Sequence, residues 1–389
     1  MTITKWTGVE VKAVRLDALR VSQKELARIL GYTEAVVRKW ESRGVTITLA
    51  REYAAAMDTL YSRLDDAQRE RFAVALSAAP ADPPHGDRSA RAVEARLPDL
   101  RCALDSHPLP EDGLIRPLGQ LRDAVAAIVD DRLNSNYLHL ACELPSLLAE
   151  LHRAHSAFAG CQREQVSALL VQAYRAADAI AGKYGYFDLS ARIIAMMWDA
   201  ARTAGDELLL AMSAYVRTEM FFVNGRLATG RRLLEQAADT IRPGRSVQDA
   251  AAYGSLHMRA AVVAAREFRP SEARAHLDEA EQIASLVPES IYLGTAFGPS
   301  SVRIHRVSIA VELGDVGTAL SVAQAWHPSR EIPAERCSHF YIDVARAYMQ
   351  ASRRDDALQA LRSARSVAPQ HTNNHLYVRD MLAQLGGWH

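Results

Sequence analysis

The second half of the chain contains an internal repeat, and this repeat constrains the fold more than any other feature. In each copy a small residue is followed, four and seven positions later, by residues that share its helical face. The small residues are Gly230, Ala273, Ala319 and Ala357, and the residues twelve positions before them are Thr218, Ala261, Val307 and Ala345. A period of roughly 40 residues indicates stacked helix pairs, in which small residues let the two helices approach closely.

The helical spacing extends beyond these four copies. An earlier copy is expected around Ala179, Ala191, Ala195 and Trp198. A more divergent helix pair is expected at 114–157, and a terminal capping helix at 375–385. Alanine, leucine and arginine recur at helical spacing in nearly every window, and the alternation typical of strands is almost absent. We therefore expect an all-α protein.

The segment SAAPADPPHGDRSA, residues 77–90, has the composition of a linker. Its prolines fix extended backbone, and its small polar residues cannot bury much surface. A chain of 389 residues also exceeds the size of a single core, which is about 250–300 residues. The sequence predicts a five-helix domain at 1–78, a proline-rich linker at 79–97 and a helical-repeat domain at 98–389.

The composition is that of a folded protein outside the membrane. Hydrophobic residues make up 49% of the chain and charged residues 24%, and no apolar run reaches the roughly 18 residues that a membrane helix needs. We expect a cytoplasmic location. The four cysteines, which show neither the paired spacing of a zinc ribbon nor that of a disulfide framework, are Cys102, Cys142, Cys161 and Cys337.

Common enzyme signatures are absent from the sequence. It contains no Walker loop, nucleophile elbow, zinc-protease motif or dinucleotide-binding glycine motif. His152 with His155, and His139 with Cys142, have the spacing of metal ligands on a helix, but neither pair has acidic or thiol companions at a suitable position. We expect no enzymatic activity, no cofactor and no metal.

The stretch SQKELARILGYTEAVVRKWESRG, residues 22–44, predicts two short helices joined by a tight turn. Ser22 and Glu25 form a capping-box pattern, and Gly31 suits the end of the first helix. Thr33 can cap the second helix, in which Val37 and Trp40 face inward.

Three further helices are expected around these two. Thr7 to Glu10 repeats the capping-box pattern, and apolar spacing predicts helices at 49–60 and 66–76. Residues 1–51 contain ten basic and five acidic side chains, although the net charge of the whole chain is zero. This end of the chain could therefore meet phosphate groups.

From Ser22 to Glu41 the chain resembles the Cro and phage-repressor-like (XRE-type) helix-turn-helix regulators, with the pattern S-Q-x-x-L-A-x-x-L-G-x-[TS]-x-x-x-[VI]-x-x-W-E. The resemblance implies that the helix after Thr33 enters the major groove of DNA. The implied base-reading residues are Glu34, Ala35, Val36, Arg38 and Lys39, and the implied phosphate contacts are Gln23 and Arg43.

The chain departs from this family at one position. Family members often pair the glutamate after the tryptophan-like position with an arginine six residues before the capping serine. Leu16 stands at that place here, and Arg15 lies one residue earlier. The pattern therefore does not predict an ion pair with Glu41.

Residues 160–385 resemble tetratricopeptide repeats in an elongated form, and LGDVGTAL, residues 313–320, is the best match. The resemblance implies an α-solenoid whose concave surface comes largely from the first helix of each pair. The candidate effector-binding residues on these helices are Tyr215, Glu219, Asn224, Met258, Arg259, Arg303, His305, Arg306, His339 and Arg346. An irregular helical bundle is the alternative to a solenoid.

The combined layout resembles actinobacterial regulators and, more distantly, the peptide-pheromone receptors of Gram-positive bacteria. Those receptors hold a signalling peptide with several asparagines of the groove, whereas this chain has only Asn134, Asn136, Asn224, Asn373 and Asn374. The effector could therefore be a peptide, a protein or a small molecule.

These features predict a sequence-specific transcriptional regulator that binds a double-stranded DNA operator. One recognition helix supplies little base discrimination, so we expect a homodimer joined through the repeats. The alternative is an interaction adaptor whose repeats recruit a protein and whose helix-turn-helix does not bind DNA.

Overall fold

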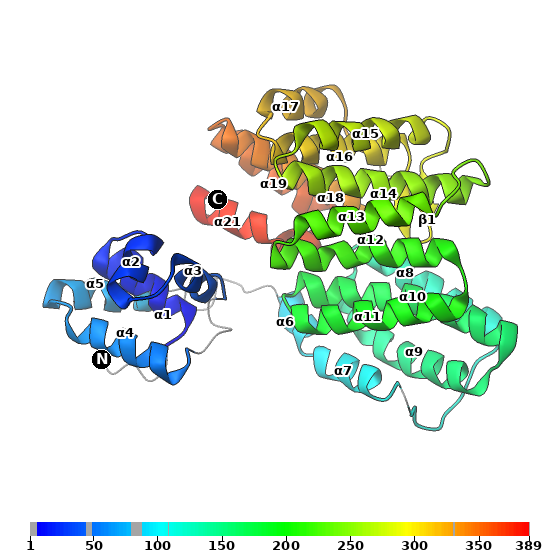
Figure 1. The fold of residues 1–389 in the computed structure, drawn as a ribbon, viewed down its shortest axis with the longest axis horizontal. Coiled ribbons are helices and arrows are strands. Elements are labelled where there is room, and N and C mark those ends of the chain that lie inside the picture. The colour runs from blue at the N-terminus through cyan, green and yellow to red at the C-terminus, as the bar shows by residue number, and fades with distance from the viewer. Residues whose placement is uncertain (1–5, 44–48, 79–87, 108, 330, 389) are drawn as a thin grey trace. The chain divides into compact units, whose positions relative to one another are not determined.

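The computed structural model describes residues 6–43, 49–78, 88–107, 109–329 and 331–388, and the protein divides into two compact units. We call residues 1–86 the N-terminal unit and residues 87–389 the C-terminal unit. Within the described ranges the protein is helical apart from one short hairpin, as Figure 1 shows. The expectation of an all-α protein is thus confirmed at this level. No helix of those ranges is long and apolar enough to cross a membrane.

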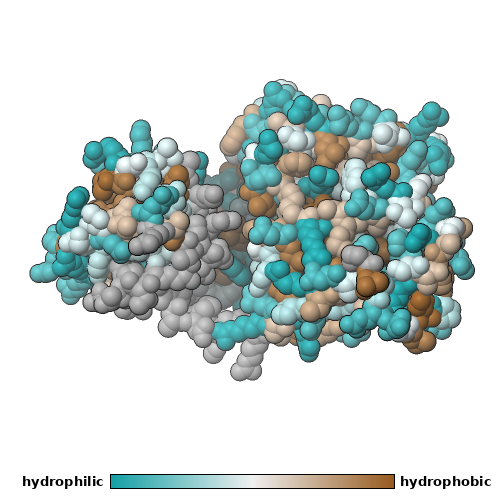
Figure 2. All heavy atoms as spheres, turned by 60° about the horizontal axis from the view of Figure 1, so that its bottom comes forward, coloured by the Kyte–Doolittle hydropathy of each residue, from teal (hydrophilic) through white to brown (hydrophobic). Residues whose placement is uncertain are grey.

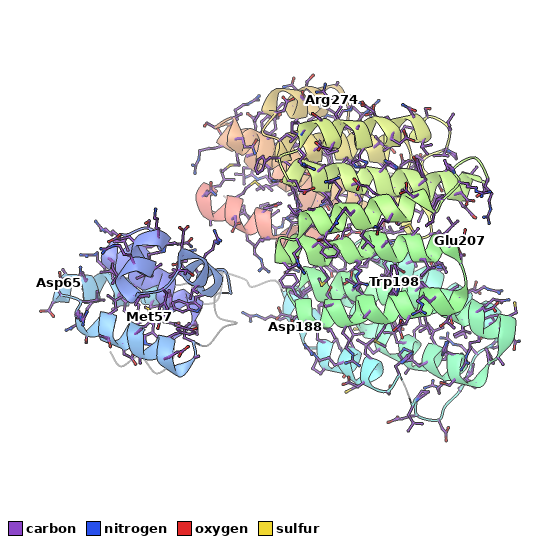
Figure 3. The ribbon with its side chains drawn as sticks, viewed as in Figure 1. Met57, Asp65, Asp188, Trp198, Glu207 and Arg274 are labelled. Carbon is purple, nitrogen blue, oxygen red and sulfur yellow. The ribbon has the colours of Figure 1, made fainter. Side chains whose placement is uncertain are left out.

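The N-terminal unit is a small helical domain. Its helices are α1 Gly8–Ala13, the π-helix η1 Val14–Leu19, α2 Gln23–Leu30, α3 Glu34–Arg43, α4 Arg51–Ser62 and α5 Asp66–Ala78. Thr7 caps α1, and Glu10 returns the bond to the Thr7 amide at 2.7 Å, which confirms the capping box. Met57 of α4 is fully buried in the core with Phe72, whereas Asp65 lies exposed before α5 (Figure 3).

The C-terminal unit consists mainly of consecutive helix pairs. Two helices come first, α6 Arg88–Glu94 and α7 Leu97–Asp105. The pairs are α8 Leu118–Leu133 with α9 Tyr137–Ala157, α10 Gly160–Lys183 with α11 Phe187–Ala204, α12 Glu207–Asn224 with α13 Leu227–Asp239, α14 Val247–Arg266 with α15 Pro270–Ala284, α16 Pro299–Glu312 with α17 Val316–Ala325, and α18 Ala334–Gln350 with α19 Arg354–Val367. The short helix α20 Pro369–Asn374 and the terminal helix α21 Leu376–Leu385 complete the unit.

The small residues of the repeat lie where the helices of each pair meet. Gly230, Ala273, Ala319 and Ala357 are all buried, as are the residues twelve positions before them. At Gly230 a β-carbon would come within 3.1 Å of Phe221 on the preceding helix. The expected close approach of paired helices is therefore confirmed for these four copies.

The expected register of the earlier copy is wrong by one residue. Ala191 and Ala195 are exposed, whereas Ser190 is buried and its hydroxyl hydrogen-bonds the carboxylate of Asp178, twelve positions before it. This pair of polar side chains replaces the two small residues seen elsewhere. Ala191 and Ala195 therefore lie on the outer face of α11, which a pattern of small residues alone cannot distinguish from the inner one.

The linker expected at 79–97 is also too long. Residues 79–87 lie outside the described ranges, but α6 begins at Arg88 and α7 at Leu97. Val93 of α6 is fully buried and belongs to the core of the C-terminal unit. These residues are therefore part of the folded unit.

A β-hairpin between α15 and α16 enters the interior of the C-terminal unit. Its strands are β1 Ser290–Tyr292 and β2 Thr295–Phe297, joined by Leu293 and Gly294 with positive φ angles of 49° and 75°. The turn carbonyls accept hydrogen bonds from Arg132 of α8 and Arg175 of α10. Because these arginines come from early pairs, the hairpin tip bridges the start and the later part of the helix array.

The last helices of the C-terminal unit return to its first helices. α18 packs against α8, and α20 packs against α6. The amide of Leu138 donates to Oε1 of Gln370 at 2.9 Å, and Nζ of Lys183 lies 2.6 Å from Oε1 of Glu335. The array therefore closes on itself, with the hairpin tip inside.

The surface of the C-terminal unit shows no single broad apolar area on the face seen in Figure 2. Hydrophobic residues lie there in scattered groups among hydrophilic ones. Exposed apolar side chains of this kind are normal on folded proteins.

Candidate functional site

The turn between α2 and α3 is fixed by its backbone. Gly31 has a φ of 77°, and the amide of Tyr32 donates to the carbonyl of Ala27 at 2.9 Å. This closes α2 and lets α3 begin directly after Thr33. Two short helices with a tight turn were expected here, and the structure confirms them.

The capping box expected at the start of α2 is only half present. The hydroxyl of Ser22 accepts from the amide of Glu25 at 3.1 Å, as expected. The carboxylate of Glu25 instead pairs with Arg28, one turn further along the exposed side of the helix, at 2.6 Å. Glu25 thus pairs with the charged side chain of Arg28 in place of the backbone amide of Ser22.

α3 is held from beneath by its apolar side chains. Val37 is fully buried and Trp40 is 3% exposed. The Trp40 ring packs against Tyr32 of the turn and Tyr53 of α4, with ring centroids 5.7 and 5.1 Å away. These contacts fix the direction in which the opposite side of α3 faces.

The predicted base-reading residues all belong to the first two turns of α3. Glu34 and Arg38 are exposed, whereas Val36 is half-buried and packs partly on the core. Ala35 and Lys39 lie on the same helix, but their side chains are outside the described part of the structure. The same holds for the predicted phosphate contact Arg43 at the end of α3.

Arg15 forms the ion pair with Glu41 that the sequence pattern did not predict. Nε of Arg15 lies 2.5 Å from one carboxylate oxygen and its terminal nitrogen 2.8 Å from the other, and both side chains are at most 10% exposed. The π-helix η1 explains the shift by one residue. A π-turn contains about one residue more than an α-turn, so an arginine seven positions before Ser22 reaches the place that six positions would reach in an α-helix.

Gln23 joins this ion pair. Its amide nitrogen donates to the carboxylate of Glu41 at 2.7 Å, so the start of α2 is tied to the end of α3. The phosphate contact of Gln23 stays a prediction. In the structure the side chain connects α2 with α3 through its hydrogen bond to Glu41.

Exposed basic side chains surround the start of α2. Arg20 and Lys24 flank the capping Ser22, and both are exposed, as is Arg38 on α3. Amides at a helix start and nearby cations together favour bound phosphate. This part of the surface therefore suits a polyanion.

Three of the predicted effector-binding residues come together inside the C-terminal unit. The guanidinium of Arg259 lies 5.1 Å from the ring centre of Tyr215 and pairs with Glu219. On its other side Tyr215 meets Arg175, which also holds the hairpin carbonyl of Leu293. The hairpin turn thus shares Arg175 with this group of side chains.

Most of the other predicted effector residues lie apart from this group. Met258 is fully buried in the apolar core, so a ligand does not reach it in this conformation. Arg303 lies over Trp326, and Arg306 pairs with Glu281. Two more have partners close by: the side chain of Asn224 accepts from the Arg226 amide at the end of α12, and Arg346 pairs with Glu312 and Asp343.

His305 faces the hairpin from the other side. It is buried, and its Nε2 lies 3.1 Å from a guanidinium nitrogen of Arg336, which also approaches the hairpin carbonyl of Ala296. Burial, followed by the charge of Arg336, holds the pKa of His305 well below its usual value. A neutral ring next to an arginine at neutral pH is consistent with this arrangement.

Two of the histidines that the sequence singled out form hydrogen bonds within the protein. His152 hydrogen-bonds the hydroxyl of Tyr174 at 2.8 Å, and burial lowers its pKa to about 3. His139 pairs with Asp131 at the surface. Sequence reasoning missed a different group, His339, His371 and His375, although the last two are spaced like ligands on a helix. His339 lies 32 positions before His371, and only the packing of α18 on α20 brings it near.

No protein-family model matches the chain, and the search of curated proteins found no similar sequence.

Proposed function

We propose that the protein is a sequence-specific DNA-binding regulator, that the N-terminal unit is a Cro-like helix-turn-helix domain, and that α3 is its recognition helix. The observation that carries the proposal is the packing of α3. Val37 and Trp40 fix the helix from beneath, and Glu34 and Arg38 are left exposed on its first two turns. A helix presented in this way, with its N-terminal residues outward, suits the major groove.

The brace between the two helices supports the same proposal. The buried contacts among Arg15, Gln23 and Glu41 fix the start of α2 relative to the end of α3. A reading helix needs such rigidity because hydrogen bonds to base edges depend on position within a fraction of an ångström. Arg20 and Lys24 would then meet the phosphates beside the groove.

The C-terminal unit, in this proposal, is a tetratricopeptide-like array that dimerises and senses an effector. A dimer would place two copies of α3 about one turn of DNA apart, roughly 34 Å. An effector that changes the array would change this spacing and thereby the DNA affinity.

The test begins with selection of bound duplexes from a random library by the full-length protein. We expect a two-fold symmetric sequence with half-sites about 10 base pairs apart. The affinity for this sequence is then compared with that for random DNA by fluorescence anisotropy over a series of salt concentrations.

Arg38→Ala is the critical variant. Loss of a base contact is expected to weaken binding to the selected sequence about 10-fold or more and binding to random DNA far less. The matched control is Arg63→Ala, which removes the same charge from an exposed position at the far end of α4. No enriched sequence, or an equal effect of the two variants, would rule out the assignment of α3 as reader.

A further inference from the structure

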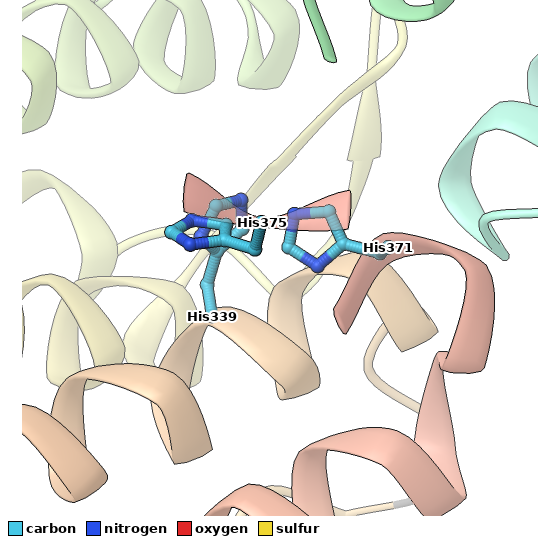
Figure 4. Close-up of side chains that lie close together, drawn as sticks. All are labelled: His339, His371 and His375. Atoms are coloured by element: carbon cyan, nitrogen blue, oxygen red, sulfur yellow. The ribbon is translucent and has the colours of Figure 1, made fainter. Parts of the chain in front are cut away.

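The histidines 339, 371 and 375 form a compact cluster in the C-terminal unit. One ring nitrogen of each lies within 4.8 Å of those of the other two, and the rings come from α18, from α20 and from the residue before α21 (Figure 4). The ring centres of His339 and His371 are 4.4 Å apart, and that of His375 lies 5.5 and 5.2 Å from them. His371 is only 2% exposed.

We infer that His339, His371 and His375 form a binding site for one divalent transition-metal ion of the zinc class. Three imidazoles and one water are a common ligand set for Zn²⁺. Ligand nitrogens about 2.0–2.1 Å from such an ion lie roughly 3.4 Å from one another in tetrahedral geometry. Binding of one ion would therefore draw the three nitrogens closer together than the 4.8 Å within which they now lie.

The hydrogen bond of His371 to Ser338 involves Nδ1, so Nε2 is the ring nitrogen that would bind a metal. The hydroxyl of Ser338 donates its one hydrogen to the carbonyl of Glu335 at 2.8 Å. The same hydroxyl lies 2.6 Å from Nδ1 of His371 and accepts from it when that nitrogen carries the proton. The tautomer with its proton on Nδ1 leaves Nε2 with a free electron pair, and a metal-bound histidine has the same outer hydrogen bond.

An independent observation comes from His375. Its Nδ1 is buried and has no hydrogen-bond partner among the described residues. A buried polar nitrogen without a partner costs free energy, and a metal ion would satisfy it.

The charges around the cluster are positive, and they include Lys183 near His371 and His375. Burial, followed by the charge of Lys183, holds the pKa of His371 well below its usual value and lowers that of His375 to about 3. Lys183 itself pairs with Glu335, which reduces its repulsion of a cation.

A bound ion would link three elements at the point where the array closes. α18 packs against α8, and α20 packs against α6, so the ligands lie on the helices that return to the start of the unit. The ion would thus hold the C-terminal end of the unit in place. The inference does not depend on DNA binding.

The test uses the full-length protein, stripped with a chelator and titrated with Zn²⁺ alone by calorimetry. Exposed thiols could also hold zinc, so the measurements use a background of Cys102→Ser, Cys142→Ser and Cys161→Ser. We expect one ion per chain and a rise of the melting temperature with Zn²⁺ concentration. His371→Ala with His375→Ala should abolish both.

Two further variants separate binding from folding. Ser338→Ala keeps all three ligands and is expected to weaken Zn²⁺ binding about 10- to 100-fold, and its melting temperature without metal measures what the lost hydrogen bond to His371 contributes to folding alone. His139→Ala removes an exposed histidine outside the cluster and should leave affinity unchanged. Absence of one-to-one binding in the parent protein, or full binding in the double histidine variant, would overturn the inference.

Discussion

At the scale of single residues, the N-terminal unit contains two ion pairs of similar geometry in opposite surroundings. Arg15 and Glu41 are almost fully buried, whereas Arg28 and Glu25 are 73% and 41% exposed. Water and salt screen the pair of Arg28 and Glu25, and if one partner is removed, the charge of the other stays in contact with solvent. Removal of Arg15 leaves the carboxylate of Glu41 buried, with Gln23 as its one remaining side-chain donor among the described residues.

Arg15→Ala is therefore expected to destabilise the N-terminal unit by about 3 kcal/mol. Arg28→Ala, the matched control, should cost below about 0.5 kcal/mol. Hydrogen exchange of the amides of α2 and α3 in the full-length protein measures both. Similar protection in the two variants would contradict a structural role for the buried pair.

The buried histidine His152 makes the C-terminal unit sensitive to acid. Its pKa is about 3 in the folded protein and about 6.5 in an unfolded chain. As the pH falls below about 6.5, the unfolded chain takes up a proton that the folded protein does not. The stabilisation that His152 contributes to the C-terminal unit is thus complete above about pH 6.5. It falls by roughly 1.4 kcal/mol per pH unit as the pH is lowered toward 3.

His152→Gln should remove the contribution of this histidine to the pH dependence of the free energy of unfolding. Urea denaturation of the C-terminal unit between pH 4.5 and 7.5 is expected to give a shallower slope than in the parent. The control is His139→Gln, since the hydrogen bond to Asp131 raises the pKa of the exposed His139 and any slope from it has the opposite sign. An unchanged slope in His152→Gln would show that the ring is protonated in the folded state.

At the scale of elements, the hairpin is the feature that depends most on close packing. Phe297 of β2 is fully buried against α14, and a β-carbon on Gly254 would come within 2.1 Å of its ring. Glu289 caps α16 through the amides of Ser300 and Ser301 at 2.7 and 3.0 Å. The hairpin is thus fixed at its strand and at its exit.

Gly254→Ala is expected to displace Phe297 and to destabilise the C-terminal unit by about 1–3 kcal/mol. In Gly119→Ala, the control on α8, the added methyl group meets nothing within 4 Å, so stability should stay equal or rise slightly. Thermal unfolding by circular dichroism compares the two. A loss in Gly119→Ala as large as in Gly254→Ala would contradict the clash with Phe297 as the cause.

The sequence predicted the helix pairs well, but it did not predict the hairpin, the π-helix or the histidine cluster. Periodic apolar and small residues determine where α12 to α19 lie, because each pair must bury the same face. The three-residue strands β1 and β2 are too short for a period to be recognised. The π-helix that aligns Arg15 with Glu41 and the cluster of His339 with His371 both depend on how helices pack, which local spacing does not contain.

At the scale of the whole C-terminal unit, Glu335 holds together the two ends of the array. Its carboxylate lies 2.6 Å from Lys183 and 3.7 Å from Arg132, and all three side chains are mostly buried. Lys183 and Arg132 belong to early pairs, whereas Glu335 begins α18. Closure of the array therefore depends on a charged contact between distant parts of the chain.

Glu335→Ala would leave two buried cations without their partner and is expected to cost roughly 3–5 kcal/mol. Hydrogen exchange should rise in α8, α10 and α18 together, because all three lose the same contact. Glu331→Ala removes an exposed carboxylate just before α18 and serves as the control. A local increase confined to α18 would argue that apolar packing alone closes the array.

The hairpin tip that Arg132 and Arg175 hold has a consequence for any molecule that would occupy the centre of the array. The tip is tethered on both sides, by α15 and α16, so its local concentration stays constant however dilute the protein is. An incoming ligand competes with it, and the apparent affinity equals the intrinsic affinity multiplied by the fraction of molecules whose tip has withdrawn. The strength of the tip's own contacts would thus set a threshold concentration, which substitutions in the hairpin could tune without altering a single ligand contact.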